Sequence, residues 1–269
     1  MLLVIDVGNT NTSLGVYSGA ELVAHWRLTT ARARTVDEYG VHARNLFELA
    51  GVDFQAISAV AIASVVPPLN FTLKRMSELY FNRTPLFIDH TTETGVPILY
   101  DPPGDVGADR IVDAVAAVHK YGAPCIVVDF GTATTFDAIN ARGEYLGGVI
   151  TPGITISSDA LFERAARLPR VEIKRPVSVI GSSTVGSIQS GLYYGYVGLV
   201  DGILGRMREE LGETARVIAT GGLAPLIATG SQLIETVDDT LTLEGLRLVY
   251  ERTTSSEFQV PSSKSELGL

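Results

Sequence analysis

The stretch that decides the fold is Asp6-Val7-Gly8-Asn9-Thr10-Asn11-Thr12, which directly follows an apolar run at residues 2–5. Two more apolar runs come after it, at residues 13–17 and 22–26, and the turn-like pair Ser18-Gly19 separates them. Short apolar runs bounded by small polar residues are typical of strands in a β-meander. The stretch therefore predicts a polar turn at the end of the first strand of a sheet.

A second copy of this pattern follows the apolar residues 125–128, where the chain continues as Asp129-Phe130-Gly131-Thr132-Ala133-Thr134-Thr135. Each copy then continues with a strand, a glycine turn and another strand. We interpret the repeat as an internal duplication. It predicts two α/β domains, residues 1–120 and residues 121–252.

The composition is that of a folded, acidic protein. Of 269 residues, 46% are hydrophobic and 19% are charged, which excludes a disordered chain. A net charge of −9 argues against nucleic-acid binding, and the single cysteine, Cys125, excludes a disulfide scaffold. No basic segment precedes the apolar start, so we expect a cytoplasmic protein without a signal peptide. Residues 253–269 are rich in Ser and Thr, and we expect a disordered tail there.

The rest of the chain alternates predicted strands and helices. We expect strands at residues 59–66, 86–88, 145–150 and 215–220, and helices at residues 35–50, 71–80, 108–120, 157–168 and 184–211. One face of the last helix carries Gly191, Gly195, Gly198, Gly202 and Gly205. Each glycine costs a helix about 1 kcal/mol relative to alanine, so we expect a close helix contact along this face, within a subunit or across a dimer. Asp201 in the same helix argues against a membrane span.

An Asp-x-Gly turn at the end of a strand suits a phosphate group. Glycine lets the backbone approach a ligand, and the small turn presents N–H groups and hydroxyls to phosphoryl oxygens. The aspartate would repel phosphate, so we expect it to hold a cation or its water. One such turn is equally compatible with an ordinary polar β-turn. Two at equivalent points of a duplicated fold predict a nucleotide in the cleft between the domains.

A third polar cluster, Asp105-Val106-Gly107-Ala108-Asp109-Arg110, opens the predicted helix at residues 108–120. A carboxylate and a guanidinium at a helix N-terminus can capture an anionic substrate and remove a proton beside it. Taken from spacing alone, helix capping by either aspartate is the favoured interpretation. Gly221-Gly222, between a predicted strand and helix, is compatible with an adenine site or with a tight turn.

Other nucleotide and metal motifs are absent from the sequence. It contains no P-loop and no Gly-x-Gly-x-x-Gly after a strand. Asp129-Phe130-Gly131 matches the metal motif of protein kinases, but no His-Arg-Asp accompanies it, so we regard the match as chance. The four histidines do not have zinc-ligand spacing.

Together these motifs, with Gly147-Gly148-Val149-Ile150-Thr151-Pro152-Gly153, resemble the type III pantothenate kinases over residues 1–252. That family belongs with the acetate and sugar kinases, Hsp70 and actin. The resemblance implies duplicated ribonuclease-H-like (actin-like ATPase) domains with a cleft between them. It also implies a homodimer that uses ATP to phosphorylate pantothenate to 4′-phosphopantothenate, the first step of coenzyme A biosynthesis. Mg²⁺ and a monovalent cation, K⁺ or NH₄⁺, are the implied cofactors.

The resemblance also assigns roles to individual residues. Asp109 would be the catalytic base, and Asp129 would hold the monovalent cation. The residues implied for ATP are Asp6, Val7, Gly8, Asn9, Thr10, Asn11, Thr12, Ser13 and Thr132. Those implied for pantothenate are Tyr100, Gly107, Ala108, Asp109, Arg110 and Thr184, with Thr184 near the dimer interface. For Asp109, the resemblance favours the base over the helix cap.

Two other functions are compatible with the fold. A regulatory relative without catalysis would bind nucleotide or a protein partner, but the intact Asp6, Asp109, Arg110 and Asp129 argue against it. An actin-like ATPase or a sugar kinase would share the nucleotide turns. The chain is short for the former and lacks a sugar-binding acid motif for the latter.

Overall fold

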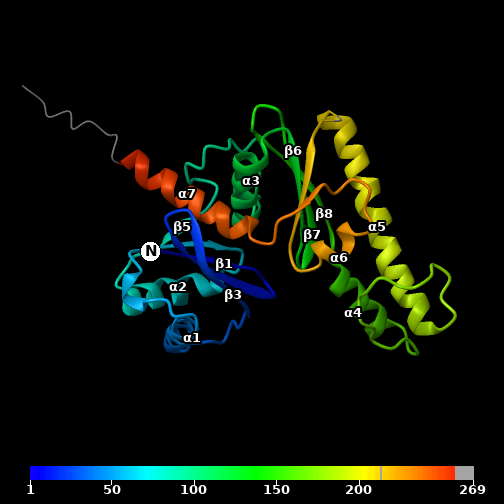
Figure 1. The fold of residues 1–269 in the computed structure, drawn as a ribbon, viewed down its shortest axis with the longest axis horizontal. Coiled ribbons are helices and arrows are strands. Elements are labelled where there is room, and N and C mark those ends of the chain that lie inside the picture. Colours follow the sequence, from blue (N-terminus) through cyan, green and yellow to red (C-terminus); the bar gives the residue numbers. More distant parts are fainter. Residues whose placement is uncertain (213, 258–269) are drawn as a thin grey trace, which may run out of the picture.

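The computed structural model describes residues 1–212 and 214–257. The strands of this part of the chain form two five-stranded sheets (Figure 1). The first sheet contains β1 (Leu2–Val7), β2 (Asn11–Ser18), β3 (Glu21–Thr29), β4 (Ala59–Ser64) and β5 (Leu86–Ile88). The second contains β6 (Cys125–Phe130), β7 (Ala133–Ile139), β8 (Tyr145–Pro152), β9 (Arg216–Thr220) and β10 (Thr236–Val237).

The two sheets have the same topology. Their strand orders are β3-β2-β1-β4-β5 and β8-β7-β6-β9-β10. In each sheet the first three strands form an antiparallel meander, and the last two add in parallel beside the first strand of the meander. This repeat confirms the predicted duplicated α/β fold. The ends of β1 and β6 become equivalent points of the two halves.

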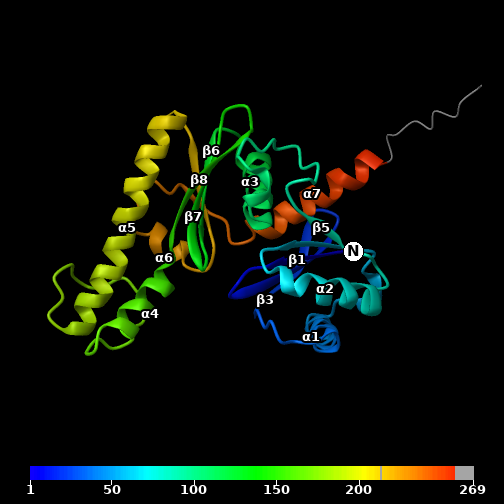
Figure 2. The same ribbon diagram turned by 180° about the vertical axis from the view of Figure 1, so that it is seen from behind.

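Helices separate and cover the sheets (Figures 1 and 2). The α-helices are α1 (Val36–Leu49), α2 (Pro67–Met76), α3 (Ala108–Tyr121), α4 (Ile154–Arg164), α5 (Thr184–Leu211), α6 (Ala224–Ala228) and α7 (Leu241–Glu257). Single turns are η1 (Phe54–Ala56), η2 (Ser77–Phe81) and η3 (Pro103–Asp105). Helices α1 and α2 cover the outer face of the first sheet, α4 to α6 lie on the outer side of the second, and α3 and α7 lie between the sheets.

Alternation along the strands builds this layered core. In β1, Leu3 and Ile5 face α1 and α2, whereas Leu2 and Val4 face α3 and α7. The first strand of the second sheet repeats the pattern, with Val127 facing the central helices. The central layer is packed closely, because a Cβ on Gly245 of α7 would lie 2.0 Å from the carbonyl oxygen of Val112 in α3.

Several element boundaries differ from the prediction. Helix α2 begins at Pro67, since proline is well suited to the first turn of a helix, so the Pro-Pro pair starts a helix as well as ending a strand. Helix α4 begins and ends a few residues early, and β10 was not expected. The C-terminal helix α7 packs against β1 of the first sheet. The domain boundaries at residues 120 and 252 therefore stay predictions.

The last turn of α7 includes residues 253–257, which we expected in the tail. Hydroxyls of Thr253, Thr254 and Ser255 donate to carbonyls one turn earlier, which lets these residues continue the helix. Residues 258–269 of the predicted tail lie outside the described part of the chain. Among the described helices, none has the length and hydrophobicity needed to cross a membrane.

The glycine face of α5 makes no close contact within the described chain. A Cβ added at Gly191, Gly195, Gly198 or Gly205 would meet no atom within 4 Å, and one at Gly202 would meet only Arg206. The structure therefore does not show the close helix contact within the subunit that was one of the two alternatives for this face. Contact across a dimer stays a prediction.

Candidate active site

The two Asp-x-Gly turns meet between the halves of the molecule. Asp6 is the fifth residue of β1 and Asp129 is the fifth residue of β6, so the two carboxylates lie at equivalent positions near the ends of duplicated strands. They are close enough for the charge of Asp129 to raise the pKa of Asp6. The turns touch through Thr10 and Thr132, whose hydroxyl oxygens lie 2.7 Å apart. Residues separated by most of a domain in the sequence therefore form one polar site.

Hydrogen bonds fix the first turn. The N–H of Gly8 donates to the carbonyl oxygen of Asn11 at 2.9 Å, and the Thr30 hydroxyl donates to the carbonyl of Gly8 at 2.7 Å. Thr12 is buried and its hydroxyl pairs with that of Thr30 at 2.9 Å. Arg32 donates to the side-chain oxygen of Asn9 at 3.0 Å. The backbone of the turn is thus held before any ligand arrives.

Asp109 lies in the first turn of α3, with Gly107 at the N-cap. No side chain caps this helix end, and the Asp109 carboxylate accepts backbone hydrogen bonds from the N–H of Arg110, at 2.8 Å, and from its own N–H. Burial raises the pKa of Asp109, while those hydrogen bonds and the Arg110 charge oppose the rise. The side chain lies inside the first turn and therefore does not cap α3 from the N-cap position.

Four carboxylates interact at this site: Asp6, Asp109, Asp129 and Asp113, of which the sequence motifs did not indicate Asp113. Burial, and then the charges of Asp109 and Asp129, raise the pKa of Asp6 well above its usual value. Burial, followed by the charges of Asp109 and Asp137, raises the pKa of Asp129 to about 7. Such a cluster repels itself, so it favours a cation or a shared proton.

Asp113 is the missed member of this cluster. It is 3% exposed, and its Oδ1 has no hydrogen-bond partner among the described residues. Burial, then the charges of Asp129, Asp109 and Asp6, raise its pKa well above the usual value, against a hydrogen bond from Thr242. Its spacing of four from Asp109 puts both side chains on one face of α3, and that signal was present in the sequence.

Arg110 is held firmly beside the cluster. Its Nε and Nη2 both lie 2.7 Å from Oδ1 of Asp137, which also accepts the Tyr145 hydroxyl at 2.6 Å. The guanidinium carbon lies 5.8 Å from the centre of the Tyr145 ring. This pairing leaves Nη1 of Arg110 for a ligand. Asp137 and Tyr145 had no local sequence signal, because their partners are distant in the sequence.

Glycines allow the carboxylates to approach the backbone. A Cβ on Gly107 would lie 2.5 Å from Oδ1 of Asp109, and one on Gly221 would lie 2.4 Å from Oδ1 of Asp129. Gly221 also has a positive φ of 90°, which favours glycine. The Gly221-Gly222 turn therefore closes over Asp129. Tyr100 packs against Gly147, where a Cβ would lie 2.9 Å from its ring.

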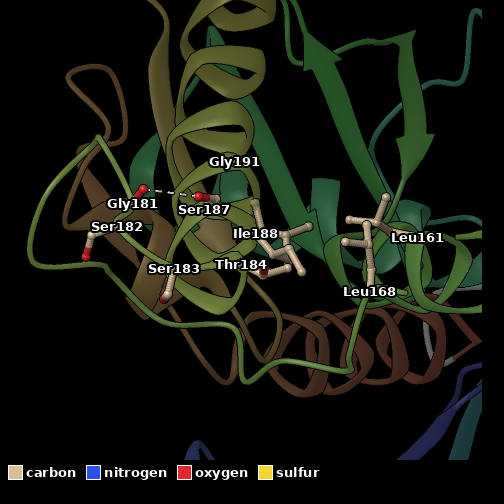
Figure 3. Close-up of a pocket in the computed structure, with 10 residues that line it drawn as sticks. Leu161, Leu168, Gly181, Ser182, Ser183, Thr184, Ser187, Ile188 and Gly191 are labelled. Carbon is tan, nitrogen blue, oxygen red and sulfur yellow. Dashed lines mark hydrogen bonds between the residues drawn. The ribbon is translucent and has the colours of Figure 1, made fainter. Parts of the chain in front are cut away.

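Thr184 lies elsewhere, in a cavity of about 770 Å³ at the N-terminus of α5 (Figure 3). Hydroxyls of Ser182, Ser183, Thr184 and Ser187 line one side, and Leu161 and Leu168 line the other. None of the clustered carboxylates lines this cavity. Within the described residues of one chain, the structure therefore does not bring Thr184 together with Asp109.

The cleft has the donors that a cation needs, but not a complete ligand set. Carboxylate oxygens suit Mg²⁺ and K⁺, and the unpartnered Oδ1 of Asp113 marks a buried position with unsatisfied charge. No group of three His, Cys, Asp or Glu side chains within the described residues is arranged to hold a metal ion. A cation here would take other ligands from phosphate, water or backbone oxygens.

Sequence comparison connects this site with known proteins. Residues 2–206 match the family model described as type III pantothenate kinase. The type III pantothenate kinase of Koribacter versatilis (strain Ellin345) is 59% identical over 266 residues, covering 95% of this chain and 97% of its own length. The enzyme of the same name from Anaeromyxobacter sp. (strain Fw109-5) is 61% identical over 252 residues, covering 94% and 99%.

Solved structures support the fold. The activator of the 2-hydroxyisocaproyl-CoA dehydratase from Clostridium difficile, with bound ADPNP, superposes with a TM-score of 0.54 at 13% identity. It covers 98% of this chain and 99% of its own. Component A of the (R)-2-hydroxyglutaryl-CoA dehydratase from Acidaminococcus fermentans gives 0.53 at 13% identity, covering 96% and 99%. At this identity the likeness concerns the fold alone.

Proposed function

The chain belongs to the type III pantothenate kinase family, and we propose that its reaction takes place in the cleft where the turns of β1 and β6 meet the N-terminus of α3. The protein is an ATP-dependent pantothenate kinase that forms 4′-phosphopantothenate for coenzyme A biosynthesis. The observation that carries our location of the reaction is the contact of Thr10 with Thr132, which joins the turns that follow Asp6 and Asp129. The charge of Asp109 acts on both of these carboxylates.

The turns would hold the triphosphate of ATP. Residues 6–13 and Thr132 offer backbone N–H groups and hydroxyls to phosphoryl oxygens, and the fixed turn needs little reorganisation to do so. The structural neighbour from Clostridium difficile holds the ATP analogue ADPNP on the same fold, which supports a nucleotide in this chain.

Asp109 would remove the proton from the primary hydroxyl of pantothenate while that oxygen attacks the γ-phosphorus and ADP leaves. The place of Asp109 in the first turn of α3 supports this role, as does the action of its charge on Asp6 and Asp129 in the two turns. Phosphoryl transfer has a loose transition state, so positioning and charge neutralisation dominate its catalysis. Proton removal contributes about 10²–10⁴-fold.

A kinase of this fold uses a divalent metal ion with ATP. We propose that this ion is Mg²⁺ and that Asp6 and the phosphates would hold it. Asp129 would hold a monovalent cation, K⁺ or NH₄⁺. The mutual repulsion that raises the pKa of both carboxylates supports cation binding at this edge. When bound, these cations neutralise charge on the triphosphate.

Pantothenate would lie over the start of α3. Gly107, Ala108 and Arg110 line that position, and Tyr100 packs close to the network that holds Arg110. Nη1 of Arg110 is the candidate donor to the pantothenate carboxylate. Thr184 would complete the site from a second copy, which explains why its cavity is separate within one chain.

The homodimer would form along the open glycine face of α5, which continues from Thr184. A cytoplasmic location is the simplest for an enzyme that consumes ATP, and the net charge of −9 argues against a nucleic-acid partner.

An ATP-consumption assay tests the function. The protein is incubated with ATP and Mg²⁺ together with pantothenate, with each of several sugars, or with no acceptor. We expect ADP release to depend on pantothenate. Release with a sugar would identify a sugar kinase, and release without acceptor an ATPase. No turnover together with nucleotide binding would identify a regulatory relative.

A further inference from the structure

Arg27 lies in the same row of the first sheet as Asp6. In the register of the meander, Asp6 of β1 pairs with Ser13 of β2, and Ser13 pairs with Arg27 of β3. Cross-strand partners project from the same face of a sheet. The neighbours of Arg27 along β3, Trp26 and Leu28, pack into the outer core with α1. Arg27 therefore projects from the opposite face, toward the cleft.

The Arg27 side chain reaches the other half of the molecule. Its Nη1 would lie 3.1 Å from a Cβ built on Gly222, in the turn that follows β9 of the second sheet. Its charge acts on both nucleotide turns, since it opposes the rise that burial and the neighbouring carboxylates cause in the pKa of Asp6 and of Asp129. The guanidinium thus lies between the two halves, close to both carboxylates that flank the cleft.

The Arg27 side chain has no hydrogen-bond or ion-pair partner among the described residues. It is exposed. The neighbouring arginines differ, because Arg110 is bound to Asp137 and Arg32 donates to Asn9. Arg27 can therefore turn its full guanidinium to a ligand without breaking a contact of the protein.

The second sheet has no counterpart to this charge. The equivalent row there runs from Asp129 to Thr135 and on to Ile150 of β8, which is 62% exposed. The duplicated site therefore receives its arginine from the first half alone. A triphosphate entering between several carboxylates needs positive charge, and a planar guanidinium matches phosphoryl oxygens in geometry as well as charge.

We propose that Arg27 binds the phosphoryl oxygens of ATP from β3 and neutralises charge during transfer. This inference rests on the proposed function, because it concerns the same cleft. Resting near Asp6 and Asp129 in the free protein, the guanidinium moves its charge to the phosphates when ATP enters. Neither the turn hydrogen bonds nor the Asp109 position depends on it.

The test compares Arg27→Gln and Arg27→Lys with Arg44→Gln, an exposed arginine on α1 at the outer face, as the matched control. Binding of the analogue AMP-PNP is measured by calorimetry with Mg²⁺, and steady-state kinetics are measured with ATP and pantothenate. We expect R27Q to weaken AMP-PNP binding roughly 10- to 100-fold. Its kcat should fall by about 10²–10³-fold, because charge on the transferring group is no longer neutralised.

R27K should lie between R27Q and the wild type, and R44Q should match the wild type. The proposal is overturned if R27Q binds AMP-PNP as tightly as the wild type, or if only the KM for pantothenate rises. If R27Q does not fold, the same measurements on R27K test the proposal. R27K with the AMP-PNP binding and turnover of the wild type would then overturn it. If the wild type does not phosphorylate pantothenate, the proposed function fails, while AMP-PNP binding still tests Arg27.

Discussion

At the scale of single residues, the carboxylates at the cleft repel one another in the free protein, and in our proposal they hold the cations that the reaction needs. Asp6, Asp113 and Asp129 come from two strands and one helix, and burial with mutual repulsion raises the pKa of each. A protein retains such a cluster where a bound cation or proton offsets the repulsion. Ligand binding and stability should therefore be coupled at these residues.

Asp129→Asn should remove the activation of turnover by K⁺ or NH₄⁺, because the amide keeps the size of the side chain but not its charge. Initial rates are measured in a Na⁺ buffer as K⁺ is added, for the wild type and the variant. Asp159→Asn, a half-buried position on α4 that pairs with Arg170 outside the cluster, is the matched control and should respond to K⁺ as the wild type does. A variant with a normal K⁺ response would show that Asp129 is not the cation ligand.

The same carboxylate predicts how stability depends on pH. The pKa of Asp129 is about 7 in the folded protein against an ordinary value of 3.8, so the folded state binds the proton more tightly. Its contribution is fully present below about pH 4 and is lost as pH rises through about 7. The pKa values of Asp6 and Asp113 are also raised, so their contributions to stability are likewise lost as the pH rises. Urea unfolding without cations should therefore show lower stability at about pH 8 than at about pH 5.

Addition of K⁺ and Mg²⁺ should restore the stability at the higher pH, since bound cations replace the proton. Asp129→Asn should flatten the pH dependence and reduce the response to K⁺. Free protein that becomes more stable between these two pH values would contradict the assignment of these carboxylates.

At the scale of elements, α3 and α7 position the site because they are packed tightly between the sheets. Gly245 lets the two helices approach, and the first turn of α3 carries Asp109 toward the cleft. Lys120 and Tyr121 at the end of α3 both donate to Asp238, in the segment that leads into α7. The helix that carries the proposed base is therefore held at its C-terminal end and at its contact with Gly245.

Gly245→Ala should destabilise the fold by about 1–3 kcal/mol, because the added methyl group would collide with the Val112 carbonyl. Gly104→Ala is the control, since its Cβ would come no closer than 3.5 Å to a neighbour, His90. Its free energy of unfolding should change by about 0.5 kcal/mol or less. Urea unfolding measures both. Equal stability of the two variants would show that α3 and α7 are not tightly packed at this point.

Local sequence patterns predicted most elements and the two Asp-x-Gly turns, since strand alternation, the Thr35 capping box and the turns themselves are local features. They did not predict that α7 returns to the first sheet or that Asp137 holds Arg110. Those contacts join residues distant in the chain. The start of α2 was missed because proline both ends strands and begins helices.

At the scale of the whole molecule, duplication gives one cleft from two similar halves, but the halves are not equivalent. The first contributes the turn that is fixed by Thr30, and the second contributes Asp129 and Asp137. The helix with Asp109 lies between them. Thr184 lies outside this arrangement, and in our proposal it completes the pantothenate site from a second chain.

Gly198→Leu should therefore disrupt the proposed dimer without harming the subunit. Its Cβ would meet no atom within 4 Å in one chain, and leucine is the better helix former. Sedimentation velocity should show a monomer, and the KM for pantothenate should rise as Thr184 of the second copy is lost. A variant that stays dimeric would place the interface elsewhere.

The most direct test of the account is the product made by Asp109→Asn. The amide preserves the shape of the side chain and the hydrogen bond from Arg110, but it cannot accept the proton. Mass spectrometry after incubation with ATP, Mg²⁺, K⁺ and pantothenate should show 4′-phosphopantothenate for the wild type. For the variant, formation should be about 10²–10⁴-fold slower with unchanged AMP-PNP binding. Product formed by the variant at the wild-type rate would contradict the claim that Asp109 is the base in this cleft.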